Sequence, residues 1–91
     1  MSQEIRFDEI SSNHEFRAKL SMASVALSAD EATAQAVREV PGVTQARVDG
    51  DGSIYFMIGG AGVNWPGLRN AVVTAIKRGQ RWTGSVTVRG F

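Results

Sequence analysis

Two short runs rich in β-branched and aromatic residues flank a glycine-rich turn in the middle of this 91-residue chain. Residues 43–48 read VTQARV and residues 54–58 read IYFMI, with the turn DGDG between them at 49–52. Aspartate and glycine tolerate the positive φ angles that a tight hairpin requires. The pattern therefore predicts a β-hairpin at mid-chain, which restricts the fold to topologies that place a hairpin between two further units.

A helix is predicted before the hairpin, at residues 29–40, where alanines, which are strong helix formers, alternate with charged residues. The tetrapeptide SADE at 28–31 has the form of a capping box. In such a box Ser28 accepts a hydrogen bond from the helix backbone and Glu31 reaches back toward Ser28. Pro41 and Gly42 follow the last periodic residue, and we expect them to end the helix.

A second helix is predicted after the hairpin, over residues 64–79. Asn64 is the expected N-cap, and Pro66 is tolerated in the first turn. Gly79 is expected to end the helix. Trp65 falls on the apolar stripe of this helix, so we expect its indole to be buried.

The remaining segments alternate as strands do. In residues 15–25, Phe16 and Leu20 face one way while Arg17 and Lys19 face the other, although Phe16 and Leu20 also fit a helical stripe, so a helix is the alternative. A last strand is expected around residues 86–88, with Val86 and Val88 facing inward, and Trp82 is expected in the core because it falls in the same register. Residues 1–14 are expected to form an additional strand or an extended arm.

This element order predicts an α+β domain spanning residues 1–91. Two β-α-β crossovers joined by a hairpin form a ferredoxin-like βαββαβ plait, in which a four-stranded antiparallel sheet carries both helices on one face. Two placements stay open for the N-terminal segment: it pairs with the sheet, or it covers the sheet face that the helices leave open.

Two stretches, AVREVPGVTQARVD and LRNAVVTAIKRG, resemble the heavy-metal-associated domain family of copper chaperones and metal-transporting ATPases. The resemblance covers residues 28–79 and implies a ferredoxin-like fold. That family binds metal through a Cys-x-x-Cys pair just before the first helix. Here the corresponding stretch is VALSAD and the chain has no cysteine, so the resemblance does not extend to metal transfer. With one histidine and no cysteine, we expect neither a metal site nor a cofactor.

Composition excludes several functional classes. The net charge of +1 argues against a strongly basic nucleic-acid binder, and no apolar run approaches the length of a membrane helix. The absence of a signal peptide suggests a cytoplasmic protein. His14 is expected in a surface turn, and Asp49 and Asp51 are expected to shape a turn rather than to bind calcium. The GGAG stretch at 59–62 is expected to be a connector, although such a loop before a helix can also bind phosphate.

No constellation of residues suits catalysis, so the favoured function is a non-enzymatic protein-interaction module: an adaptor, a regulatory subunit or a phage-type inhibitor, with a homodimer also possible. It would bind a partner through the open sheet face or a strand edge. The expected binding residues on that face are Arg17, Lys19, Arg47, Tyr55, Met57 and Arg89. No carboxylate is expected among them except at the edge, which favours an acidic partner. Single-stranded nucleic-acid binding is the alternative function, and a small enzyme or metal carrier is a third.

Overall fold

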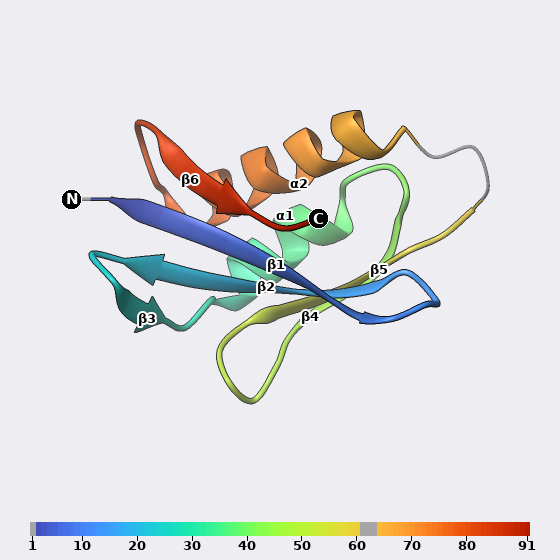
Figure 1. Ribbon diagram of the computed structural model, residues 1–91, viewed down its shortest axis with the longest axis horizontal. Coiled ribbons are helices and arrows are strands. Elements are labelled where there is room, and N and C mark those ends of the chain that lie inside the picture. The colour runs from blue at the N-terminus through green and yellow to red at the C-terminus, as the bar shows by residue number, and fades with distance from the viewer. Residues whose placement is uncertain (1, 61–63) are drawn as a thin grey trace.

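The protein is described by a computed structural model that covers residues 2–60 and 64–91. Along the chain it contains β1 (Gln3–Ser11), β2 (Glu15–Met22), β3 (Val25–Leu27), α1 (Glu31–Arg38), β4 (Val43–Val48), β5 (Ile54–Ile58), α2 (Trp65–Gln80) and β6 (Val86–Arg89). Figure 1 shows how the helices lie against the sheet that the strands form. The α+β class predicted from the sequence is therefore confirmed.

The sheet is mixed and has six strands within the described residues, in the order β4-β5-β2-β1-β6, with β3 paired to β2. β1 pairs antiparallel with β2 and parallel with β6. The predicted four-stranded antiparallel sheet is therefore wrong in strand number and in direction. The N-terminal segment, which could have been an arm, is a strand inside the sheet (Figure 1). Ile5 and Phe7 explain this, because they are fully or almost fully buried among the core side chains.

β2 confirms the strand predicted from residue 15, and the helical alternative for this segment is wrong. The strand ends at Met22 rather than at residue 25. Ala23 and Ser24 adopt positive φ angles of 51° and 66°, which fold the chain back so that β3 pairs with the end of β2. β2 also pairs with β5, with Arg17 opposite Tyr55.

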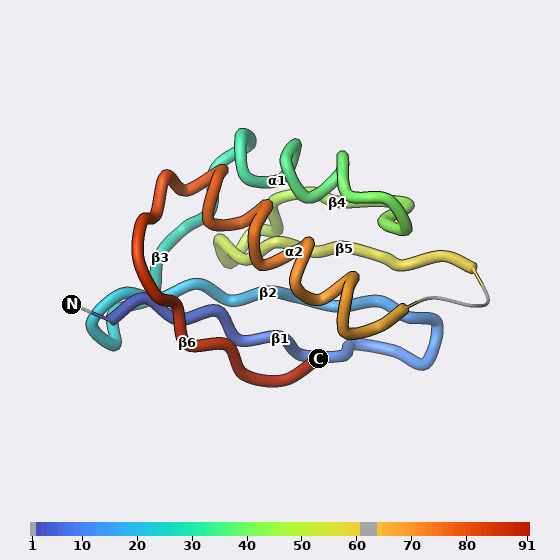
Figure 2. Tube along the Cα trace, turned by 90° about the horizontal axis from the view of Figure 1, so that it is seen from above, coloured from blue at the N-terminus to red at the C-terminus, as the bar shows by residue number. Residues whose placement is uncertain are grey.

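Both helices cover the same face of the sheet. Figure 2 shows α1 beside β4 and α2 crossing over the middle strands. A single core cluster joins the two layers, with Phe56 and Ile54 from the sheet and Val37, Val72 and Ile76 from the helices all fully buried. The radius of gyration is 12.0 Å, close to the value of about 12 Å expected for one domain of this length. No helix in the described part of the chain has the length and apolar character needed to cross a membrane.

Helix α1 begins at Glu31, two residues later than predicted. Its N-cap is Asp30, whose carboxylate accepts hydrogen bonds from the backbone N–H of Thr33 at 3.0 Å and from the Thr33 hydroxyl at 2.9 Å. The predicted capping role of Ser28 is wrong. Ser28 instead packs against Gly52 of the β4–β5 turn, where an added Cβ would lie 2.7 Å from the Ser28 hydroxyl. Gly52 has a φ of 85°, and the tight hairpin predicted at this turn is confirmed.

Helix α2 begins as predicted, with the Asn64 side chain accepting from the backbone N–H of Gly67 at 3.1 Å. It does not end at Gly79. The chain leaves the helix at Arg81, which takes a left-handed φ of 59°. Gly79 has a packing role instead, because a Cβ at this position would overlap the backbone of Thr33 in α1. The glycine thus lets the two helices approach each other closely.

Candidate functional site

The six residues predicted as a binding surface lie on the sheet face opposite the helices, which we call the open face. Arg17 and Arg47 lie on either side of Tyr55 in adjacent strands. Met57 follows two residues along β5, so its side chain lies on the same face as Tyr55. Lys19 follows Arg17 by two residues along β2, so it lies on the same face. Arg89 lies on this face as well, because Lys19 and Arg89 both pair with Arg6 of β1. The predicted grouping of these residues is therefore found in the structure.

The expectation that this face holds no carboxylate except at its edge is wrong. Asp49 binds both Arg17 and Arg47, with nitrogen-to-oxygen distances of 3.2 Å in each pair. Glu4 and Asp8 of β1 also reach the face. Arg89 lies 2.9 Å from Glu4, and Lys19 lies 3.9 Å from Asp8. The sequence argument did not count Glu4 and Asp8, because it left the placement of the N-terminal segment open and its four-stranded sheet did not include β1. The open face is a set of neutralised pairs rather than a basic surface.

Tyr55 is covered by its neighbours, although it lies on the open face. Its residue surface is only 6% exposed. The guanidinium carbon of Arg47 lies 4.1 Å from the centre of the Tyr55 ring, a cation–π contact. The phenolic hydroxyl donates a hydrogen bond of 2.6 Å to Glu15. The ring is therefore already occupied within the protein and offers little surface to a partner.

This hydrogen bond shifts the pKa values of both Tyr55 and Glu15. Donation from the Tyr55 hydroxyl, supported by Ser11 at 2.8 Å, holds the pKa of Glu15 below its ordinary value. The Glu15 carboxylate in turn raises the pKa of Tyr55, because a hydrogen bond to the neutral phenol disfavours its ionisation. Both shifts favour the neutral-phenol and carboxylate forms at neutral pH, so this pair is a structural contact rather than a proton-transfer site.

The two outer strands of the sheet differ in how their edges are protected. Beside β4, the Arg38 side chain of α1 donates to the carbonyl oxygen of Ala46 at 2.7 Å and 3.2 Å. A charged side chain held against an outer strand discourages pairing with another chain. At the other side, β6 is four residues long and pairs with β1. Short edge strands are also poor templates for pairing, so neither edge is a strong docking site.

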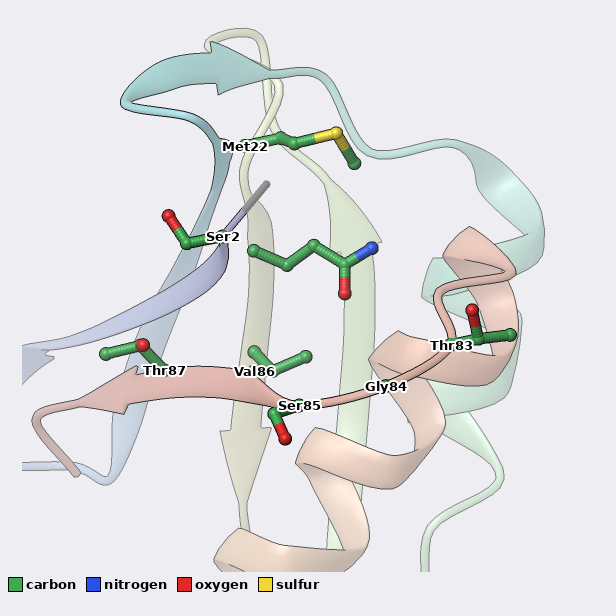
Figure 3. A pocket seen from close by; sticks show the side chains of 8 residues that line it. Ser2, Met22, Thr83, Gly84, Ser85, Val86 and Thr87 are labelled. Atoms are coloured by element: carbon green, nitrogen blue, oxygen red, sulfur yellow. The ribbon is translucent and has the colours of Figure 1, made fainter.

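One hollow, of about 760 Å³, lies where the start of β1 and the end of β2 approach β6 and the loop before it. Its lining consists of Ser2, Gln3, Met22 and residues 83–87. Figure 3 shows these side chains spread around the hollow from the three segments. None of the lining residues is ionisable, so the hollow lacks a group for acid–base or metal chemistry.

A second hollow, which we call the aromatic cleft, lies at the opposite end of the β1–β2 hairpin. It has a volume of about 380 Å³ and is lined by Glu9, His14, Phe16, Trp65 and Phe91. His14 and Trp65 meet edge to face with ring centres 5.2 Å apart, and Phe16 and Phe91 stack at 4.8 Å. Trp65 is 37% exposed, so its predicted burial is wrong. Trp82, by contrast, is partly buried against the core.

The fold brings these side chains together from distant parts of the sequence. His14 lies in the β1–β2 turn with a φ of 59°, and its carbonyl oxygen accepts from the backbone N–H of Ile58. Trp65 is the first residue of α2. Phe91 reaches the cleft because Gly90, with a φ of 76°, packs against the backbone of Phe7, where a side chain would not fit. The cleft therefore depends on tertiary structure and has no local sequence motif.

The other predicted sites keep modest roles. His14 lies in a turn, as expected, and in addition lines the cleft. Asp51 accepts from the backbone and side chain of Ser53, which is turn chemistry. Within residues 2–60 and 64–91, no three His, Asp or Glu side chains form a group that could hold a metal ion, and the absence of metal binding stays a prediction. The GGAG prediction at 59–62 falls partly on residues 61–63, which lie outside the described part of the chain.

Comparison with family models, with curated proteins and with solved structures found no match to this chain.

Proposed function

We infer that this chain is a non-enzymatic module that binds another protein, and that the aromatic cleft is its main contact surface. The observation that carries this inference is the exposed tryptophan at the cleft. Trp65 is 37% exposed, although it lies beside Phe16, which is buried, and Phe91, which is partly buried. Tryptophan in a concave surface is among the commonest sources of binding energy in protein interfaces.

The surroundings of Trp65 support this role. Phe16 and Phe91 lie 6.0 Å from its ring centre and hold the indole from the core side. A side chain fixed in this way loses little conformational entropy when a partner binds, which favours affinity. A third hollow of about 430 Å³, lined by Trp65, Pro66, Arg69, Asn70, Gly90 and Phe91, adjoins the aromatic cleft along the edge formed by Trp65 and Phe91, which line both. A peptide segment could thus place neighbouring side chains on either side of this edge.

The open face is the second candidate surface for the same function. Its residues are those proposed from the sequence, Arg17, Lys19, Arg47, Tyr55, Met57 and Arg89. The carboxylates paired with the four cations reduce its attraction for an acidic partner, and the covered ring of Tyr55 gives single-stranded nucleic-acid binding little support. A pair such as Arg89 with Glu4 is exposed and could exchange partners at small cost.

We also infer that the sheet is a ferredoxin-like plait with two added strands, β1 inserted between β2 and β6 and the short β3 paired to β2. Leaving β1 out of the order gives β4-β5-β2-β6, which is the order a plait requires. The two helices on one face agree with this interpretation, and so does the resemblance of residues 28–79 to heavy-metal-associated domains. The inserted strand would make the chain a variant of that fold.

Selection from a random peptide library displayed on phage tests the proposed function. We expect the wild-type protein to enrich peptides that bind it. These peptides should bind the Trp65→Ala variant at least about tenfold more weakly, because truncating a tryptophan at a binding hot spot costs more than about 1.4 kcal/mol. Arg89→Glu, on the open face, serves as the matched control and should keep the wild-type affinity. Failure to enrich any binding peptide would contradict the interaction function. Enriched peptides that lose binding to Arg89→Glu but not to Trp65→Ala would move the site to the open face.

A further inference from the structure

Glu9 occupies a position where the strand pattern calls for an apolar residue. Ile5 and Phe7 point from β1 into the core, and Glu9 follows them on the same side of the strand. The register agrees, because Glu9 lies directly opposite Phe16 of β2, whose ring is in the core cluster. The Glu9 carboxylate therefore stands on the helix side of the sheet, where the core ends and the aromatic cleft begins.

Glu9 also differs from the other carboxylates in its contacts. Across the described residues, each of the eight other Asp and Glu side chains takes part in a hydrogen bond or ion pair, for example Glu15 with Tyr55 and Glu4 with Arg89. No such contact involves Glu9 within residues 2–60 and 64–91. Glu9 is exposed and lines the cleft, and a carboxylate that is not paired within the described residues contributes a negative potential there.

We propose that the aromatic cleft binds an arginine side chain of the partner protein, with its guanidinium group between the Glu9 carboxylate and the exposed face of Trp65. This proposal rests on the proposed function, since it assigns the chemistry of the residue that the cleft receives. The Glu9 carboxylate and the Trp65 indole both suit a guanidinium group. A guanidinium ion is planar, stacks on indole rings and donates two parallel hydrogen bonds to a carboxylate.

The size and charge of the cleft agree with this ligand. A volume of about 380 Å³ accommodates one long side chain rather than a folded element. Arg69 of α2 lines the adjoining hollow and donates to the Gly90 carbonyl at 3.4 Å. The Lys77 ammonium is likewise engaged, with the Gly84 carbonyl at 2.6 Å. The third cation of α2, Arg78, lines a different hollow, so none of the three lines the aromatic cleft.

Two tripeptides that differ only in charge test the proposal. Acetyl-Gly-Arg-Gly-amide and the neutral analogue with citrulline in place of arginine are titrated into isotope-labelled protein, and the indole N–H signals of both tryptophans are followed by NMR. We expect the arginine peptide to shift the Trp65 signal and to leave Trp82 unchanged. The citrulline peptide should bind about tenfold more weakly, because it lacks the cation–π and charge-assisted contacts.

Glu9→Gln and Glu39→Gln make the same chemical change inside and outside the cleft. Glu9→Gln should abolish the preference for arginine over citrulline, whereas Glu39→Gln should retain it. Equal binding of the two peptides, or no shift of the Trp65 signal with the arginine peptide, would overturn the proposal. An unchanged preference in Glu9→Gln would overturn the role of Glu9. Library peptides that need Trp65 but contain no arginine would refute this inference while leaving the interaction function intact.

Discussion

Tyr55 illustrates how far a residue's surroundings can be predicted from its position in a strand. Strand alternation correctly assigned its side chain to the face opposite the helices. It could not indicate that the ring is buried on that face, because burial depends on Arg47 lying over the ring and on Glu15 accepting from the hydroxyl. Both partners come from neighbouring strands, and their side-chain conformations are set by tertiary contacts rather than by local sequence.

The Tyr55–Glu15 hydrogen bond leads to a prediction about pH. Because the pKa of folded Glu15 lies below its ordinary value, the pair contributes stability that is present above the ordinary glutamate pKa. That stability is lost as the pH falls through the folded pKa. Tyr55→Phe removes the largest cause of the shift, so we expect the pKa of Glu15 to rise toward its ordinary value and less stability to be lost on acidification.

An NMR titration of the Glu15 carboxyl carbon measures this pKa directly, and urea melts at neutral and acidic pH measure the stability. Ser11→Ala, which removes the weaker of the two side-chain donors, should raise the pKa in the same direction but less. A Glu15 pKa that is the same in Tyr55→Phe as in wild type would show that the hydrogen bond does not form in solution.

β1 is the element that sequence analysis placed least well. The alternation of Ile5 and Phe7 indicated a strand, but no local pattern specifies which neighbours a strand takes. The β-hairpin at residues 49–52 and the Asn64 cap were predicted correctly because their chemistry is local. The position of β1 between β2 and β6 depends on long-range pairing. The one sequence signal for the cleft was Glu9, a carboxylate at a position where strand alternation predicts an apolar residue. This signal becomes informative only when β1 is assigned to the sheet.

Two isoleucines on β1 test its place in the sheet. Ile5 is fully buried and Ile10 is 42% exposed on the same strand. We expect Ile5→Ala to reduce the free energy of unfolding by about 2–5 kcal/mol, as truncation of a buried isoleucine does. Ile10→Ala should change it by less than about 0.5 kcal/mol. Denaturant melts of the two variants give both values. Small, equal effects would indicate that the N-terminal segment is an arm outside the core.

At the scale of the whole molecule, the distribution of charge and aromatic groups separates two surfaces. The open face carries cations that are each paired with a carboxylate, so its field is largely cancelled beyond short range. The aromatic cleft combines an exposed indole with a carboxylate that has no partner among the described residues. The cleft joins side chains from β1, from the turn after it, from the start of α2 and from the C-terminal residue. The sequence contains no contiguous motif for such a site.

Chemical-shift mapping of a peptide obtained by phage selection tests the central claim most directly, because it locates the binding surface without mutation. The backbone amide signals of isotope-labelled protein are followed as the peptide is added. We predict that the largest shifts fall on Glu9, His14, Phe16, Trp65 and Phe91, with the open face little affected. Largest shifts at Arg17, Arg47, Tyr55 and Met57, with Trp65 unchanged, would contradict the claim that the aromatic cleft is the binding site.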